Sequence, residues 1–97
     1  MDIKKSLAVA LKKIRNVRKI TQEDFSEVSS RTYVSTIERG LYSPTVEKID
    51  ALAKVMSIHP LTLLTLAYLI DDSSKDIKTL LNQINKELID LNMTTNI

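Results

Sequence analysis

Apolar residues recur at helical spacing wherever a segment is long enough to show a period. Over residues 3–17 they fall three or four positions apart, as on one face of an amphipathic helix. Residues 46–56 repeat this spacing, and residues 60–70 are apolar along most of their length. Three helices are therefore predicted. The inner stripe of residues 3–17 consists of Ile3, Leu7, Leu11, Ile14 and Val17. The inner stripe of residues 46–56 consists of Val46, Ile49, Leu52, Ala53 and Met56.

The polar stretch that follows the first helix predicts another, shorter one. Thr21 and Asp24 have the spacing of a capping box, in which each side chain accepts a hydrogen bond from the backbone of the other residue. This spacing places the start of the short helix at Gln22. Phe25 and Val28 are its apolar residues.

A third helix is predicted over about residues 31–39. Ser30 precedes it and is a favourable N-cap residue. Val34 and Ile37 lie one turn apart and predict its inner face. Gly40 follows the helix, where a left-handed residue is least costly without a Cβ atom.

Two prolines mark the starts of later helices. Residues 43–45 (Ser-Pro-Thr) have turn chemistry, and Pro60 suits the first position of a helix that runs to about Ile70. The single histidine, His59, is expected to cap or lead into that helix rather than to bind a metal. Residues 71–74 form a polar break before a last helix over about residues 75–91.

The predicted fold class is all-α, because no segment shows the alternating pattern of a strand. The connections between helices are short. We expect residues 1–70 to form one domain and residues 71–97 to add a C-terminal helix whose end, through Ile97, is frayed.

Composition excludes several kinds of chemistry. The 97 residues suit one small domain, and they include no cysteine, one histidine and one glycine. These counts exclude a disulfide scaffold, a thiolate nucleophile, a multi-histidine metal site and a glycine-rich phosphate loop. The sequence also lacks a recognisable pair of nucleophile and base. We therefore expect no enzymatic activity, no metal and no cofactor.

The formal charge of +2 is unevenly distributed. Residues 1–20 carry +6, whereas residues 71–97 carry −2. A basic segment of this kind is either a solvated helix face or an electrostatic footprint for phosphate. The sequence shows no signal peptide, and its longest apolar run, residues 61–70, is about half the length that a bilayer requires. We expect a cytoplasmic, nucleoid-associated protein without a membrane segment.

The second and third predicted helices, joined by a tight connection, have the layout of a helix-turn-helix. Their residues make the likeness specific, because TQEDF at 21–25 is followed by RTYVSTIERG at 31–40 and SPT at 43–45. Over about residues 5–66 the chain closely resembles the Cro/repressor-type (xenobiotic-response-element type) helix-turn-helix family of transcriptional regulators. The resemblance implies a five-helix, lambda-repressor-like DNA-binding domain, in which the first, fourth and fifth helices pack beneath the pair.

The chain departs from the usual family pattern in three places. Between Gln22 and Glu38 it is two residues shorter, which bears on the angle between the paired helices and hence on docking. Lys19 stands where the family has glycine at the end of the first helix. The last predicted helix lies beyond the family core.

The resemblance assigns DNA base contacts to the outer face of the third helix, whose N-terminal residues reach base edges in the major groove. Arg31 suits guanine, whereas Thr32 and Thr36 suit the thymine methyl group. Ser30 and Ser35 are weaker candidates. The alternative is a solvated polar face on which Ser30 is a plain N-cap.

Phosphate contacts are expected on both flanks of the groove. Gln22, at the start of the short helix, suits one flank. Tyr33, Arg39 and Tyr42 suit the other, although packing beneath the short helix is an equal alternative for Tyr33. Four cations are phosphate candidates only as a group: Lys12, Lys13, Arg18 and Lys19.

Arg15 and Glu38 match a family pair in which the arginine of the first helix bonds the glutamate of the "IERG" motif beneath the turn. The resemblance therefore implies a structural salt bridge rather than a DNA contact for these two residues. Such a pair fixes geometry, and removing one partner leaves the other charge unpaired.

The last helix has apolar residues at coiled-coil spacing, four and three positions apart. This stripe either packs on the core of its own chain or forms the interface of a homodimer, which is the arrangement that we favour because DNA-binding proteins of this layout act as two-fold dimers. The stripe consists of Ile77, Leu81, Ile84, Leu88 and Leu91.

The resemblance predicts a sequence-specific regulator of transcription, a repressor in the simplest case, that binds double-stranded DNA at a pseudo-palindromic operator. A restriction-modification controller and a phage-type repressor both fit the small size. The alternative from another class is a protein-interaction module of the same fold that does not bind DNA, such as an antitoxin or an anti-repressor partner.

Overall fold

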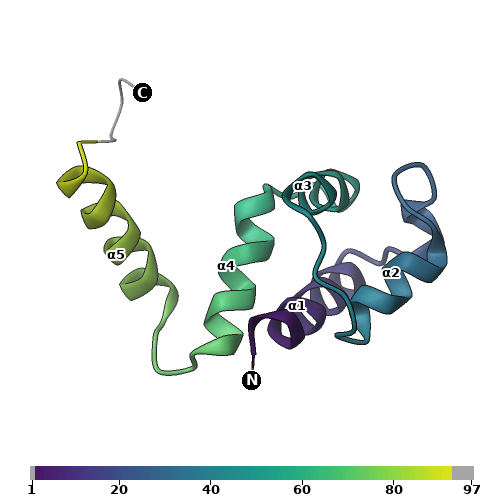
Figure 1. Cartoon of the computed structure of the whole chain (residues 1–97), viewed down its shortest axis with the longest axis horizontal. Coiled ribbons are helices and arrows are strands. Elements are labelled where there is room, and N and C mark those ends of the chain that lie inside the picture. Colours follow the sequence, from purple (N-terminus) through teal and green to yellow (C-terminus); the bar gives the residue numbers. More distant parts are fainter. Residues whose placement is uncertain (1, 93–97) are drawn as a thin grey trace.

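The computed structural model describes residues 2–92, which form helices and no strands (Figure 1). The all-α prediction is therefore confirmed over these residues. The frayed end predicted through Ile97 lies outside them from residue 93 onward. The elements, in chain order, are α1 (Ile3–Val17), the 3-10 helix η1 (Gln22–Phe25), α2 (Arg31–Glu38), α3 (Val46–Val55), α4 (Pro60–Asp71) and α5 (Ile77–Asp90).

One hydrophobic core joins α1, η1, α2, α3 and α4. Phe25 of η1 is fully buried in this core, together with Leu11 of α1 and Leu63 of α4. Burial of apolar side chains contributes about 25 cal/mol per Å² and provides most of the stability of such a domain. The core consists of Leu7, Ala10, Leu11, Phe25, Val34, Ile37, Ile49, Leu52, Met56, Leu63 and Ala67.

The predicted burial of the apolar stripes is correct for residues at the centre of each helix and wrong for some residues at the helix ends. Leu7 and Leu11 are buried as predicted, but Val17 in the last turn of α1 is 74% exposed. Val46, predicted to face the core, is 77% exposed because it is the first residue of α3 and lies beyond the surface that α3 covers. Helical periodicity defines a face but not how far along the helix a neighbour extends.

The short helix predicted from Gln22 is a single 3-10 segment of four residues. Its capping box of Thr21 and Asp24 is present. The chain then turns, and the backbone N–H groups of Val28 and Ser29 both donate to the carbonyl of Phe25 at 2.9 Å. Because Phe25 must reach the core while Ser30 already caps α2, no room remains for a longer helix.

The predicted starts of α2 and α4 and the predicted end of α2 are confirmed, whereas α5 begins at Ile77, two residues later than expected, with Asp76 as its N-cap. Ser30 Oγ accepts from the N–H of Tyr33 at 3.0 Å, and His59 Nδ1 accepts from the N–H of Leu61 at 3.0 Å. Gly40 has a left-handed backbone (φ +74°) after α2. A Cβ atom there would lie 3.4 Å from Lys5 Cγ, which is an ordinary contact, so this position favours glycine for its backbone conformation.

The last helix, α5, stands away from the rest of the molecule (Figure 1). None of its residues is buried. The radius of gyration is 14.5 Å, compared with about 12.5 Å for a compact domain of this length. The alternative in which the apolar stripe of α5 packs on the core of its own chain is therefore not the arrangement seen.

Among the described residues, no single helix is long and apolar enough to cross a membrane. Only α3 and α4 taken together reach that length and composition, and they are bent by 106° at the break between them.

Candidate nucleic-acid interface

The two faces of α2 separate core residues from polar ones. Val34 and Ile37 are fully buried beneath the helix, and this anchors its inner face. Arg31, Thr32 and Arg39 are exposed on the other side, while Ser35 and Thr36 are half-buried. The helix thus presents polar side chains from its first turn to its last, which is the arrangement that a helix in a major groove requires.

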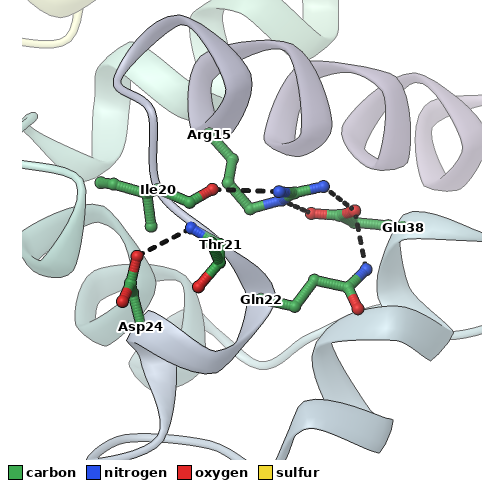
Figure 2. A network of polar contacts seen from close by, with 6 residues as sticks. All are labelled: Arg15, Ile20, Thr21, Gln22, Asp24 and Glu38. Atoms are coloured by element: carbon green, nitrogen blue, oxygen red, sulfur yellow. Dashed lines mark hydrogen bonds and ion pairs between the residues drawn. The ribbon is translucent and has the colours of Figure 1, made fainter.

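A bidentate ion pair fixes α2 to α1 (Figure 2). Arg15 Nε donates to Glu38 Oε2 at 2.6 Å, and Arg15 Nη2 donates to Glu38 Oε1 at 2.9 Å. The two side chains are only 13% and 4% exposed. The hydrogen bonds that Arg15 donates to Glu38 raise the pKa of Arg15 above its ordinary value. The structure thus places the two residues expected to pair within hydrogen-bond distance, between α1 and the end of α2.

The same network includes η1 and the chain before it. Arg15 Nη1 donates to the carbonyl of Ile20 at 3.0 Å, and Gln22 Nε2 donates to Glu38 Oε1 at 3.1 Å (Figure 2). Because one planar guanidinium contacts two segments at once, it sets the orientation of η1 and α2 together. The phosphate contact predicted for Gln22 therefore depends on the amide hydrogen that Glu38 does not use.

Arg31, the foremost base-contact candidate, forms an ion pair with η1. Its Nη1 atom lies 3.0 Å from Glu23 Oε1, and the side chains are 69% and 71% exposed. Exposed pairs contribute only about 0–1 kcal/mol. Arg31 can therefore leave Glu23 for another acceptor at little cost.

Hydrogen bonds at α2 engage the base-contact candidates Thr36 and Ser30 and also Arg39, which is a phosphate candidate. Thr36 Oγ1 donates to the carbonyl of Thr32 at 2.7 Å. Arg39 makes two longer bonds of 3.4 Å, to the carbonyl of Ser35 and to Thr36 Oγ1. Ser30 Oγ is used as the cap. Within residues 2–92, the hydroxyl groups of Thr32 and Ser35 make no hydrogen bond, and only their backbone carbonyls accept from Thr36 and Arg39.

Tyr33 packs against the core, and its ring also contacts two neighbours. The centroid of Tyr42 lies 5.7 Å from that of Tyr33, and Lys48 Nζ lies 5.3 Å from the Tyr33 centroid. Tyr33 is thus a packing residue at the core, with Tyr42 and Lys48 as its neighbours, and its phosphate contact stays a prediction. Tyr42 is 55% exposed.

Lys48 is a structural residue that the sequence did not reveal. Its Nζ atom donates to the carbonyl of Val28 at 2.5 Å and so joins α3 to the shortened turn. The ring of Tyr33 beneath it adds a cation–π contact. No sequence pattern signals this role, because the partner is a backbone atom twenty positions away.

The four cations of the first segment proposed as phosphate contacts are at the surface, unlike Arg15, which is largely buried in its ion pair. Lys12 and Lys13 are exposed on α1 and line one shallow hollow together with Glu38. Arg18 and Lys19 are exposed where the chain leaves α1. Within residues 2–92, no group of three His, Cys, Asp or Glu side chains is placed to hold a metal ion.

Comparisons with known proteins place this geometry in a family. The family model described as Helix-turn-helix, of the Cro/C1 type, matches residues 11–63, and the chain belongs to that family. Its fold is accordingly lambda-repressor-like, and the protein is a DNA-binding regulator of transcription from a generally non-enzymatic family.

A particular relative is also found. The chain is 36% identical over 67 residues to Control protein C.SmaI of Serratia marcescens, and the match covers 67% of this chain and 80% of that protein. No solved structure matches the chain significantly.

Proposed function

We propose that this protein is a sequence-specific repressor-type regulator that binds double-stranded DNA as a homodimer, with α2 in the major groove of each half of a pseudo-palindromic operator. The observation that carries the proposal is the polar outer face of α2, which the Arg15–Glu38 pair holds in a fixed orientation. Two such helices would occupy grooves about 34 Å apart. The protein would act on DNA in the cytoplasm.

The proposed base contacts are those of the first turns of α2. Arg31 provides a forked donor for guanine O6 and N7, and Thr32 and Thr36 provide methyl groups for thymine. Ser30 and Ser35 stand beside them as weaker contacts. Phosphates would be bound by residues on both flanks and on α1: Gln22, Tyr33, Arg39, Tyr42, Lys12, Lys13, Arg18 and Lys19.

The experiment contrasts a base contact with a phosphate contact. Arg31→Ala should weaken operator binding by about 1–3 kcal/mol and relax the preference at one base pair. Lys12→Ala should weaken binding to all sequences alike and reduce the salt slope by about one unit. The measurements are binding-site selection from random DNA and affinity as a function of salt.

Lys86→Ala is the matched control, because Lys86 is an exposed lysine on α5 rather than near α2. It should leave both the preference and the salt slope unchanged. If Arg31→Ala kept the affinity and the base preference of the wild type, the assignment of base contacts would be wrong.

Two narrower questions concern the kind of regulator and the alternative function that does not involve DNA. The similarity to a protein named as a control protein favours the controller over the phage-type repressor as the kind of regulator. A protein that bound a protein partner independently of salt, and selected no DNA from a random pool, would instead be the interaction module of the same fold.

A further inference from the structure

An apolar groove lies between α4 and α5. It has a volume of about 550 Å³, and its walls are almost entirely aliphatic. Leu61, Leu66 and Leu69 of α4 form one wall, and Ile77 and Leu81 of α5 form the other. Leu61 is 61% exposed and Ile77 is 57% exposed, so these side chains are open to solvent in a single copy of the chain.

The groove continues along α4 toward the end of α1. A second hollow shares Ile14, Thr62 and Leu66 with the groove and extends it to Val17 and Ile58. Lys13 and Arg18 stand at its rim. We call the two hollows together the α4 trough, which has an apolar floor and a basic far end.

The helix α5 has more apolar surface than the groove uses. Only its first two stripe residues line the groove, whereas Ile84, Leu88 and Leu91 are 41%, 43% and 68% exposed. A helix of 14 residues is marginal in water unless its apolar face is covered. Each copy of the chain therefore carries both an open apolar trough and an unpaired apolar helix.

We infer that the occupant of the α4 trough is α5 of a second copy of this chain, so that two copies exchange their last helices. The inference rests on the homodimer of the proposed function and specifies how that dimer forms. Reciprocal exchange of one element is a low-cost route to a two-fold dimer. It covers the trough and the α5 stripe of both copies at once.

Charge complementarity gives the direction of the exchanged helix. Glu87 and Asp90 lie at the end of α5, where the helix dipole adds partial negative charge. Lys13 and Arg18 lie at the far end of the trough. The partner's α5 therefore enters with its C-terminal end toward these two cations.

This arrangement changes the proposed phosphate contacts. A cation that faces the acidic end of a partner helix is not free for DNA. The exchange narrows the phosphate contacts on and after α1 to Lys12 and Lys19.

Disulfide cross-linking tests the exchange directly, because the natural chain contains no cysteine. The experiment mixes Val17→Cys with Leu88→Cys, with one of the two variants carrying a size tag, under mild oxidation. The mixture should give a disulfide-linked pair of unequal chains. A mixture of Ser26→Cys with Leu88→Cys is the control, since Ser26 is exposed but outside the trough, and it should give only a slow background.

A charge-reversal series gives a second measurement. Arg18→Glu should shift the dimer toward monomer in sedimentation equilibrium by about tenfold in dissociation constant, and combining it with Glu87→Lys should restore dimerisation. Circular dichroism of each variant establishes that it is folded. If Arg18→Glu is folded and its dimer has the same dissociation constant as the wild type, the inference is overturned.

The outcomes separate this inference from the proposed function. A dimer in which Leu88→Cys cross-links to itself, and not to Val17→Cys, overturns the exchange in favour of a direct α5–α5 contact and leaves the homodimer standing. A wild-type protein that is monomeric at micromolar concentration and also on operator DNA overturns both. Neither result changes the base contacts of Arg31, which the DNA selection tests independently.

Discussion

At the scale of single residues, Arg15 and Glu38 have the greatest effect on the DNA-binding face. Their ion pair joins α1 to α2, and through Ile20 and Gln22 it also holds η1. Buried charges are costly unless each polar atom has a partner, and here the carboxylate oxygens and all three guanidinium nitrogens have one. The pair therefore acts mainly by selecting one arrangement of the two helices.

Removing one member of this pair should destabilise the protein. Glu38→Ala leaves the Arg15 guanidinium largely buried without its carboxylate, at a cost of about 2 kcal/mol or more. For a domain of this size, that loss lowers Tm by roughly 10 °C. Glu23→Ala, which removes the exposed carboxylate of the Arg31 pair, should change Tm very little. Equal Tm values for Glu38→Ala and the wild type in thermal denaturation would contradict the structural role.

Lys19 has a left-handed backbone (φ 58°) just after the C-cap of α1, a position that favours glycine. A residue with a Cβ atom pays about 1–2 kcal/mol for this conformation. Lys19→Gly should therefore stabilise the protein by about 0.5–1 kcal/mol, after allowance for the greater freedom of glycine in the unfolded chain.

Lys12→Gly is the matched control for that variant, because it removes the same charge from a helical position inside α1. It should lower Tm, whereas Lys19→Gly should raise it. The two variants would change Tm in the same direction only if the loss of charge, and not the backbone conformation, dominated both effects.

At the scale of elements, α1, α2 and α3 end in the same way. Each is followed by a left-handed residue (Lys19, Gly40 and Ser57), and the next N–H donates back across the last turn. These bonds run from Ile20 to the carbonyl of Arg15, from Leu41 to Thr36 and from Ile58 to Ala53. Only the end of α2 carries glycine, and that is the end that packs closely against α1.

The N-terminal cap of α1 should make stability depend on acid pH. Asp2 Oδ1 accepts from the N–H of Lys5 at 2.8 Å, and this hydrogen bond lowers the pKa of Asp2 below its ordinary value. A lowered pKa means that the stabilisation is present above about pH 4 and is lost as the pH falls through the folded-state pKa.

Asp2→Asn isolates this contribution, because asparagine caps a helix about as well as aspartate but does not titrate. Its Tm at neutral pH should be close to that of the wild type, and its Tm should fall less steeply on acidification. Asp72 and Asp76, whose pKa values are also lowered by local hydrogen bonds, account for part of the remaining slope. Parallel Tm curves for the two proteins between about pH 5 and 2 would contradict the role of Asp2.

At the scale of the whole molecule, charge and apolar surface lie on different parts. The first twenty residues carry +6 and precede the polar helix α2, whereas the open apolar surface lies between α4 and the acidic segment 71–97. The proposed function requires this separation, because it assigns phosphate binding to one surface and the second copy to another. The extended shape follows from the same division, because α5 stands away from the core.

The apolar stripe of α5 should make assembly depend on that helix. Wild-type protein should sediment as a dimer at micromolar concentration, and its Tm should rise with protein concentration. Leu81→Lys combined with Leu88→Lys should give a monomer whose Tm no longer depends on concentration. Asn82→Lys, which adds charge on the same helix outside the stripe, should remain dimeric; its dissociation would argue against a specific apolar interface.

The sequence by itself determined the helical class, the order of the helices and the two faces of α2. These follow from periodicity and from caps such as Ser30 and His59, which depend on residues only a few positions apart. The family resemblance also identified Arg15 and Glu38 as partners. The left-handed backbone of Lys19 was signalled only by the glycine that the resemblance places at this position, and not by the lysine itself.

Only the tertiary structure decided which of these surfaces meet. It replaced a short helix with η1, exposed Val17 and Val46, packed Tyr33 against the core, and placed Lys48 on the carbonyl of Val28. It also left α5 apart from its own core. Helical periodicity predicts which side of a helix is apolar. Whether a residue on that side is buried depends on how far the packed neighbouring elements reach, and these come from distant parts of the chain.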